Sequence, residues 1–315
     1  MHEKLIPVVS IVGPTASGKT DLSVELSKMF NGEIVSADSM QIYKEFKVST
    51  AKPDFKQLSE VKHYLIDELS VLEEYSVAEF VKRAQSYILD INGRGRLAFV
   101  VGGTGLYMDS LLKNINFENG CGKNFVSEDK FHDLNGDDLY AALKKVDPKS
   151  ASEIHPNNKK RIARALSFYY SFGYPISVQK ERSLSSVSPY AVCKIGINFR
   201  NRQTLYNRIN LRVEKMFEDG IVSEAKKILE MNLSKTASGA IGCKELKDYV
   251  FGEISLEEAK NRLKTATRRY AKRQLTWFRR DEEINWIYAD DFDDFLKVLE
   301  SCKDMLKKFL KKINQ

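Results

Sequence analysis

Residues 8–27, "VVSIVGPTASGKTDLSVELS", decide the fold, because they join a buried strand, a glycine-rich loop and a helix in one stretch. The loop from Gly13 to Thr20 fits the pattern G-x-x-x-x-G-K-[ST], which in this strand–loop–helix context binds phosphate groups, usually those of a nucleotide. The loop amides and the helix N-terminus attract the anion, and Lys19 adds a positive charge. Thr20, or else Ser17, is predicted to place a hydroxyl on Mg²⁺. We therefore expect a P-loop protein.

The chain around this loop alternates apolar strands with helices. Near-continuously apolar strands in that order indicate an α/β fold with a parallel sheet and helices on both faces. The predicted strands are 5–12, 32–39, 63–69 and 96–105, and the helices between them are 19–30, 76–91 and 107–112.

The rest of the chain is predicted to be helical. Residues 113–157 break the alternation and are predicted to form a small, mostly helical inserted subdomain. Residues 158–315 are expected to be mostly helical, with long helical segments at 158–171, 201–231, 256–280 and from 292, and to complete the core begun by residues 1–112.

Composition limits the class of protein. The 315 residues are 43% hydrophobic and 30% charged, which is typical of a globular protein. No apolar run reaches the ~18 residues of a membrane span, so no membrane partner is expected. Four scattered cysteines without a C-x-x-C pair argue against a zinc site or a disulfide framework and suit the cytoplasm.

Positive charge is concentrated in one part of the chain. Between residues 200 and 280 there are 19 Lys and Arg against 10 Asp and Glu, within a net charge of +7. Such a block favours an anionic partner, with nucleic acid as the first candidate, although a solvated basic face gives the same pattern.

The usual acid for ATP hydrolysis is not visible. Such enzymes need an acidic residue at a strand end to hold Mg²⁺. The best-placed strand, 96–105, ends in Gly102-Gly103-Thr104 instead. Asp38, after the second strand, is the other candidate and could serve a metal or act as a base. The loop therefore predicts phosphate binding but not hydrolysis.

Several segments together resemble the tRNA dimethylallyltransferases of the bacterial type, over about residues 8–287. The segments are "GPTASGKT", "SADSMQIYKEF", "STAKP", "VVGGTGLYMDSLL", "KKRIARAL", "RINLRVEKMFEDGIVSEAKKIL", "AIGCKEL" and "RRYAKRQLTWFRR". That family transfers a dimethylallyl group from dimethylallyl diphosphate to the exocyclic N6 amine of the adenine 3′ to the tRNA anticodon. The resemblance implies that the loop holds the donor diphosphate, which is the leaving group, so no water need be activated.

The resemblance also implies roles for individual residues. Asp38 would be the general base, and Thr104 would hydrogen-bond or orient the amine. Either Arg208 or Arg212, one helical turn apart, would join the loop in binding diphosphate. The loop residues implied are Gly13, Pro14, Thr15, Ala16, Ser17, Gly18, Lys19 and Thr20.

Four segments are implied to contact the anticodon stem-loop of tRNA. In the first, Gln41 carries a donor and an acceptor that can read a base edge. The residues are Asp38, Ser39, Met40 and Gln41; Lys160, Arg161, Ile162, Ala163 and Arg164; Gly242 and Lys244; and Lys272, Arg273, Gln274, Trp277 and Arg279. The resemblance also implies that the inserted subdomain 113–157 contacts tRNA and that the protein is a monomer.

Three alternatives stay open from the sequence. A small-molecule kinase would need a lid with arginines, and 113–157 contains none. A transferase acting on free adenine nucleotide would not need the long basic helices, and a non-catalytic RNA-binding protein would not need Asp38. The family's arginine in the inserted region is missing, and Lys123 or Lys130 is the candidate substitute.

Overall fold

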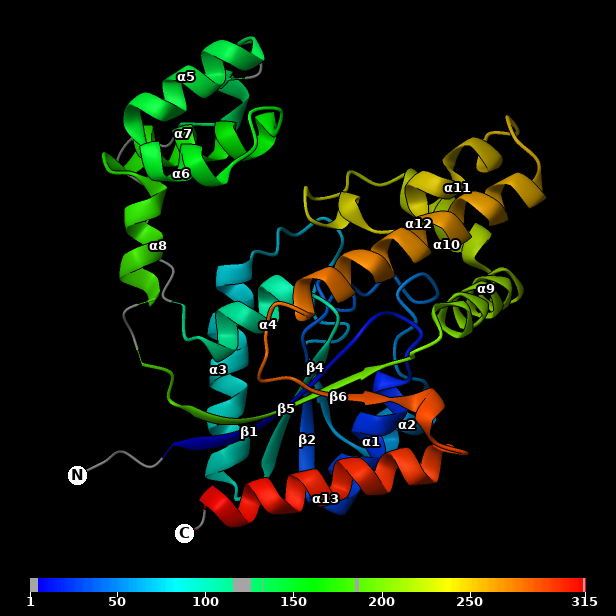
Figure 1. The fold of residues 1–315 in the computed structure, drawn as a ribbon. Coiled ribbons are helices and arrows are strands. Elements are labelled where there is room, and N and C mark those ends of the chain that lie inside the picture. The colour runs from blue at the N-terminus through cyan, green and yellow to red at the C-terminus, as the bar shows by residue number, and fades with distance from the viewer. Residues whose placement is uncertain (1–4, 116–125, 132, 185–186, 314) are drawn as a thin grey trace. The chain divides into compact units, whose positions relative to one another are not determined.

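The computed structural model describes residues 5–115, 126–131, 133–184, 187–313 and 315 (Figure 1). The chain divides into two compact units, one made of Met1–Leu112 with Pro189–Gln315 and the other of Lys113–Ser188. None of the described helices is long and apolar enough to span a membrane.

A six-stranded parallel sheet forms the core of the first unit. The strand order is β3-β2-β4-β1-β5-β6. The strands are β1 (Ile6–Val12), β2 (Gly32–Ser36), β3 (His63–Tyr64), β4 (Leu97–Gly102), β5 (Tyr190–Asn198) and β6 (Asn285–Tyr288). The predicted parallel sheet is confirmed. Two strands that the sequence did not predict lie in the mostly helical part after residue 158: β5 pairs with β1 along its length, and β6 pairs with β5.

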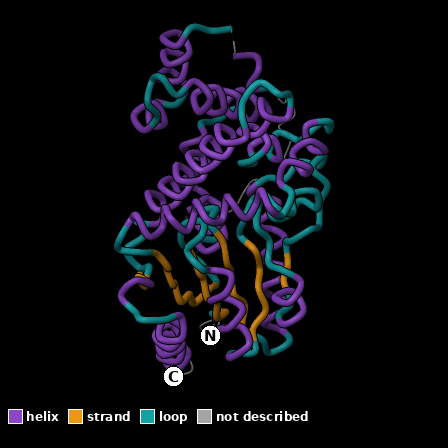
Figure 2. The backbone as a smooth tube through the Cα atoms, turned by 90° about the vertical axis from the view of Figure 1, so that its right-hand side faces the viewer, coloured by secondary structure: helices purple, strands orange, loops and turns teal. Residues whose placement is uncertain are grey.

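Helices cover both faces of this sheet (Figure 2). On one face, α1 (Lys19–Met29) and α13 (Phe295–Ile313) bury Leu22, Leu26 and Leu306 against strand residues such as Ile11 and Ile195. On the other, α3 (Val77–Gly93) contacts β1, β2 and β4 and buries an apolar stripe, Phe80, Ala84, Ile88 and Ile91. The alternation of β1 side chains between these layers explains why the strand is apolar throughout.

A helical group completes the first unit beyond β5. It consists of α9 (Arg202–Glu218), α10 (Ile221–Leu229), α11 (Cys243–Val250) and α12 (Leu256–Phe278). The predicted single helix 201–231 is split at Gly220, whose φ of 92° is left-handed and ends α9. Val213, Ile221, Leu246 and Leu263 form the shared core of the four helices. Two helices, α2 (Phe55–Glu60) and α4 (Gly105–Leu112), follow β2 and β4.

The second unit is a helical cluster of its own. Its helices are α5 (Gly136–Val146), α6 (Pro148–Glu153), α7 (Lys159–Phe172) and α8 (Ile176–Leu184). It ends at Ser188 and not at 157, because Ile162 and Leu166 of α7 pack with Leu139 and Leu143 of α5 in one hydrophobic cluster. Asp147 is buried here and accepts hydrogen bonds from the backbone and hydroxyl groups of Ser150 and Ser177.

Candidate active site

A cavity of about 220 Å³ lies at the carboxyl ends of the central strands. Parallel sheets bind ligands at this edge, where the strand-to-helix loops meet. The cavity brings together segments that are far apart in the chain. Its walls come from the phosphate loop (Thr15, Lys19, Thr20), 38–41, 49–51, 101–103, α9 (Arg212, Met216), Ile221, 239–241 and α12 (Leu263, Thr267, Tyr270, Arg273, Gln274).

The phosphate loop is packed tightly against β5. A Cβ at Gly13 would lie 2.3 Å from the carbonyl oxygen of Ile197, so only glycine allows this approach. Ala16 has a left-handed φ of 64°, and its carbonyl oxygen accepts a hydrogen bond of 2.9 Å from Arg208 Nε. Ser17 Oγ is buried and has no hydrogen-bond partner among the described residues. The Ser17 hydroxyl is therefore a hydrogen-bond donor of the loop that the rest of the described chain does not use.

Lys19 is held inside the cavity in an unusual state. Its ammonium donates a hydrogen bond of 2.7 Å to the carbonyl oxygen of Pro14. Burial, followed by the positive charge of Arg212, lowers the pKa of Lys19 from 10.5 to about 7, while Asp38 acts in the opposite direction. An anion bound at the loop would stabilise the charged form of this side chain.

The two arginines of α9 have different positions. Arg208 is exposed, lies 5.4 Å from the Phe199 ring centroid, and with Arg212 lines a second pocket at the phosphate loop. Arg212 lines the cavity, and burial lowers its pKa although Asp38 partly offsets that effect. Its Nε is buried without a partner in the described part of the chain. Of the two arginines, only Arg212 also lines the cavity that contains Asp38.

The two carboxylate oxygens of Asp38 have different surroundings. Its Oδ1 accepts hydrogen bonds from the backbone N–H groups of Met40 (2.9 Å) and Gln41 (3.3 Å), which fixes the turn after β2. Within the described residues Oδ2 has no such bond, and Asp38 lines the cavity. The carboxylate is thus oriented by one oxygen and available through the other.

Thr104 lies behind this turn. Its Oγ1 accepts a hydrogen bond of 3.1 Å from the backbone N–H of Ser39, and Thr104 is not among the residues that line the cavity. It joins the end of β4 to the end of β2, and so fits orientation of the turn better than contact with an amine. Tyr270 of α12 is a site residue that the sequence reasoning missed. It lines the cavity near Asp38, and burial raises the pKa of its phenol.

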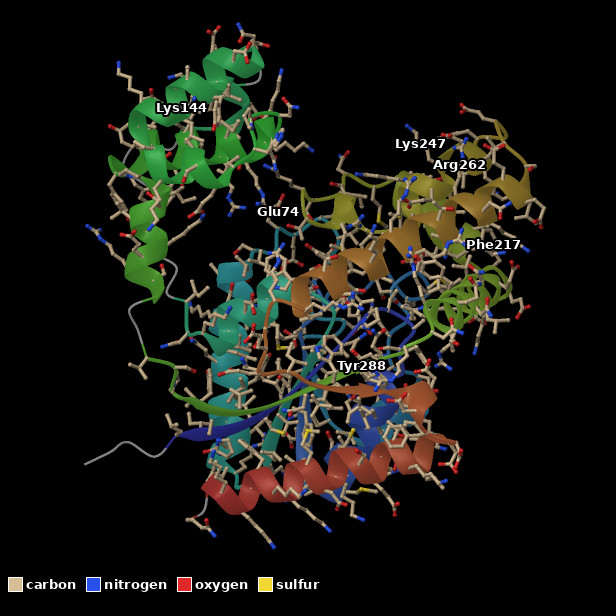
Figure 3. All side chains as sticks on the ribbon, viewed as in Figure 1. Glu74, Lys144, Phe217, Lys247, Arg262 and Tyr288 are labelled. Atoms are coloured by element: carbon tan, nitrogen blue, oxygen red, sulfur yellow. The ribbon has the colours of Figure 1, made fainter. Side chains whose placement is uncertain are left out.

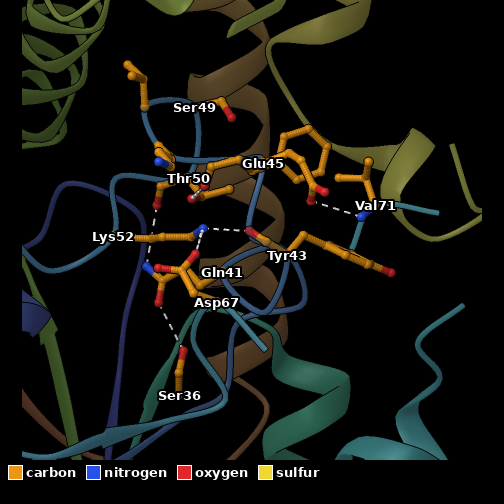
Figure 4. Close-up of polar contacts among 12 residues, drawn as sticks. Ser36, Gln41, Tyr43, Glu45, Ser49, Thr50, Lys52, Asp67 and Val71 are labelled. Atoms are coloured by element: carbon orange, nitrogen blue, oxygen red, sulfur yellow. Dashed lines mark hydrogen bonds and ion pairs between the residues drawn. The ribbon is translucent and has the colours of Figure 1, made fainter. Parts of the chain in front are cut away.

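The predicted base-reading residue Gln41 is already engaged within the chain (Figure 4). Its Oε1 accepts a 2.9 Å hydrogen bond from Ser36 Oγ, and its Nε2 donates to the carbonyl oxygens of Thr50 (3.4 Å) and Ala51 (3.5 Å). Nearby, Lys52 bonds the carbonyl oxygen of Tyr43 at 2.5 Å. A base edge would have to replace one of the long bonds of Gln41.

Exposed basic side chains on α12 are concentrated near its C-terminal end. Arg262 pairs with Asp248 and Glu258, and Lys260 and Lys264 pair with Glu214, so charge in the first half is largely neutralised. Figure 3 shows Arg262 projecting from α12 and Lys247 from α11. The residues that stay exposed toward the end are Arg269, Lys272, Arg273, Arg279 and Arg280.

Three residues predicted to contact tRNA have side chains that are buried or hydrogen-bonded within the chain. Ile162 is fully buried in the core of the second unit, because it lies on the apolar face of α7. Gln274 is 5% exposed, and both ends of its amide bond other parts of the chain. The Trp277 indole N–H donates to Asp109 at 2.9 Å, which anchors α12 on α4.

The remaining predicted contacts have accessible or cavity positions. Lys244, Lys272, Arg273 and Arg279 are exposed, and Ser39 and Met40 line the cavity, whereas Gly242 is buried. In the second unit Lys160, Arg161 and Arg164 are exposed and Ala163 is partly buried. Of the two substitutes for the missing arginine, Lys130 is exposed and Lys123 lies outside the described residues.

The family described as IPP transferase matches residues 41–281. The chain belongs to this family. Curated tRNA dimethylallyltransferases match it over nearly its whole length, including the phosphate loop and Asp38 that precede the matched range. The enzyme of Thermoanaerobacter sp. (strain X514) is 45% identical over 98% of this chain and 99% of its own, and that of Acetivibrio thermocellus is 46% identical over 96% and 98%.

Solved structures of IPP transferases have the same fold. The full-length tRNA isopentenylpyrophosphate transferase of Bacillus halodurans superimposes with a TM-score of 0.73 at 39% identity, over 98% of both chains. A eukaryotic dimethylallyltransferase captured acting on tRNA superimposes with a TM-score of 0.78 at 28% identity, over 90% of this chain and 74% of its own. The similarity spans both units and not the P-loop core alone.

Proposed function

We propose that the chain transfers a dimethylallyl group from dimethylallyl diphosphate to the N6 amine of the adenine 3′ to the anticodon in tRNA, and releases diphosphate. One observation carries the proposal. A carboxylate with one open oxygen, Asp38, lines the same cavity as Lys19 and Arg212, so a base and an anion site meet there. The names of the full-length relatives support this activity.

The leaving group would be stabilised at the phosphate loop. As the C–O bond of the donor breaks, negative charge grows on the diphosphate, and donors fixed in advance reduce the cost of that charge. The loop amides, Lys19 and Arg212 are such donors, and the buried hydroxyl of Ser17 is a further one. Apolar cavity residues such as Met216, Ile221 and Leu263 offer the five-carbon chain an apolar surface.

The acceptor amine would be activated by Asp38. An exocyclic amine is a weak nucleophile, and a positioned carboxylate can take its proton while the C–N bond forms. Asp38 Oδ2 receives that proton, and Oδ1 stays bonded to the turn through Met40 and Gln41. Thr104 and Tyr270 would hold the turn and the base in register. The adenine reaches this cavity only when it is flipped out of the anticodon stack.

Mg²⁺ fits the donor set of the loop. The hydroxyls of Thr20, which lines the cavity, and of Ser17, which is buried without a partner in the described chain, are hard oxygen ligands at the loop. The described residues contain no group of three or more His, Cys, Asp or Glu that could hold an ion, so the remaining ligands would come from diphosphate and water. When bound, the ion would neutralise charge on the diphosphate.

The tRNA would be bound through its phosphates. Fixed positive charge in the first unit comes from the exposed residues Lys272 and Arg273 on α12, Arg279 just after it and Lys244 on α11. In the second unit it comes from Lys160, Arg161 and Arg164. A monomer and a cytoplasmic location stay predictions.

The test is transfer from labelled dimethylallyl diphosphate to an unmodified anticodon stem-loop, read as prenylated adenine after nuclease digestion. Asp38→Asn keeps an acceptor for the turn but removes the base, so we expect turnover to fall about 10²- to 10⁴-fold with hairpin affinity nearly unchanged. Asp304→Asn, an exposed carboxylate on α13, is the matched control. No product from folded wild-type protein refutes the function, and an active Asp38→Asn variant refutes the base assignment.

A further inference from the structure

Gln274 connects two strand ends from inside α12. Its Oε1 accepts a hydrogen bond of 2.9 Å from the backbone N–H of Thr15 in the phosphate loop, and its Nε2 donates one of 3.0 Å to the carbonyl oxygen of Gly103 after β4. The side chain is 5% exposed. A Cβ at Gly103 would lie 2.0 Å from Gln274 Nε2, so the backbone is shaped to receive this amide. The Gln274 amide therefore ties the phosphate loop to the backbone that follows β4.

The neighbours of Gln274 on α12 are more accessible than Gln274 itself. Lys272 and Arg273 are exposed, and Arg273 also lines the cavity. One turn further along, the Trp277 indole bonds Asp109, and a Cβ at Gly105 would lie 2.3 Å from the Trp277 ring. The end of α12 is thus docked on the phosphate loop by Gln274 and on α4 by Trp277. A shift of this part of the helix has to move Thr15 or break these bonds.

We propose that Gln274 is a positioning residue that links RNA bound on the outer face of α12 to the shape of the donor diphosphate site. The inference rests on the proposed function. An RNA that fixes α12 would, through Gln274, fix the Thr15 amide and the first part of the loop. Since such coupling is reciprocal, bound donor would tighten RNA binding by the same factor. The donor would then be held in its reactive arrangement mainly when the acceptor is present.

The test compares donor binding with and without RNA. Gln274→Met keeps the volume and removes both hydrogen bonds, whereas Gln274→Glu keeps the acceptor for Thr15 and loses the donor to Gly103. Thr276→Ala, two residues along on the exposed side of α12, is the control. A non-reactive thio analogue of dimethylallyl diphosphate is titrated alone and with saturating anticodon hairpin, and the hairpin is titrated alone.

In the wild type and in Thr276→Ala we expect the hairpin to tighten analogue binding. In Gln274→Met the analogue should bind about tenfold more weakly, as expected for one or two lost hydrogen bonds, and the effect of the hairpin should disappear. Without the analogue, the affinity of Gln274→Met for the hairpin should differ from that of the wild type by less than about twofold. A general loss of structure would instead weaken hairpin binding as well. Gln274→Glu should lose part of the coupling, and it decides the question if Gln274→Met does not fold.

Two results overturn the inference. The first is that the hairpin changes analogue affinity by the same factor in wild type and in Gln274→Met, or changes it in neither. The second is that Gln274→Met loses analogue binding and hairpin binding to the same extent. Both outcomes leave wild-type transfer of the prenyl group intact, whereas failure of the proposed function would appear as wild-type protein that makes no prenylated adenine.

Discussion

Raising the pH from about 6 to about 9 should weaken donor binding through Lys19. In the free protein, burial and Arg212 lower the pKa of Lys19 to about 7. A diphosphate at the loop favours the charged ammonium, so binding should raise this pKa and take up a proton above pH 7. The sign follows: a group that binds a proton more tightly in the complex favours the complex at low pH. Donor affinity should therefore be complete below about pH 7 and fall above it.

The size of the effect follows from the pKa of about 7. At pH 8 about nine-tenths of the free protein has neutral Lys19, so the dissociation constant should rise about tenfold for each further pH unit. Calorimetry of donor binding in two buffers of different ionisation enthalpy measures the same quantity directly, and at pH 8 it should report uptake of nearly one proton. The titrations are run with EDTA so that no divalent ion contributes.

Lys19→Arg is the control, because guanidinium stays charged at these pH values and leaves only the titration of the donor itself. Asp38→Asn should move the onset to lower pH, because the carboxylate raises the pKa of Lys19, and Arg212→Met should move it to higher pH. A dissociation constant that is as flat with pH in the wild type as in Lys19→Arg would refute the reasoning.

Three further predictions concern other residues. Glu33→Gln should lower the free energy of unfolding, measured in urea, by about 2 kcal/mol. The reason is that Arg94 and Tyr64 hold the pKa of this buried carboxyl at about 2. The extra stability of the wild type over Glu33→Gln should vanish as the pH falls from about 4.5 toward 2. Asp147→Asn should speed amide hydrogen exchange in α6 and α8, because the Asp147 carboxylate accepts hydrogen bonds from Ser150 in α6 and Ser177 in α8. These bonds also lower the pKa of Asp147 against the effect of its burial. Unchanged protection of both helices would contradict this. Arg212→Lys should raise the KM for donor about tenfold or more, and an effect no larger than that of Arg208→Lys would contradict its cavity role.

Much of the fold followed from local patterns. The loop at 13–20 and the apolar strands around it predicted the parallel sheet and its ligand edge, and Asp38 does line the cavity. Strand β5 was missed because it follows a helical stretch and carries Lys194 amid its apolar residues. Its strand identity depends on β1, more than 170 residues earlier, so no local window contains the cause.

The choice between side chains one turn apart depended on tertiary packing. Arg208 and Arg212 lie on one helix, and only the packing of α9 against α12 places Arg212 in the cavity. Gln274 is different, because the information was present in the sequence. The buried residues Leu263, Thr267, Ala271, Gln274 and Phe278 follow one helical stripe. The resemblance implied RNA contact for Gln274, whereas the helical period assigns Gln274 to the packed face.

The contact between Gly13 and Ile197 has a consequence for how the protein is made. The phosphate-loop motif is translated within the first twenty residues, but the backbone that it rests on emerges only after almost two hundred. Until β5 is made, the growing polypeptide has an open hydrogen-bonding edge along β1, and the phosphate loop lacks the strand against which it packs. A prematurely terminated product would keep the recognisable signature of a phosphate binder and lack the means to act as one.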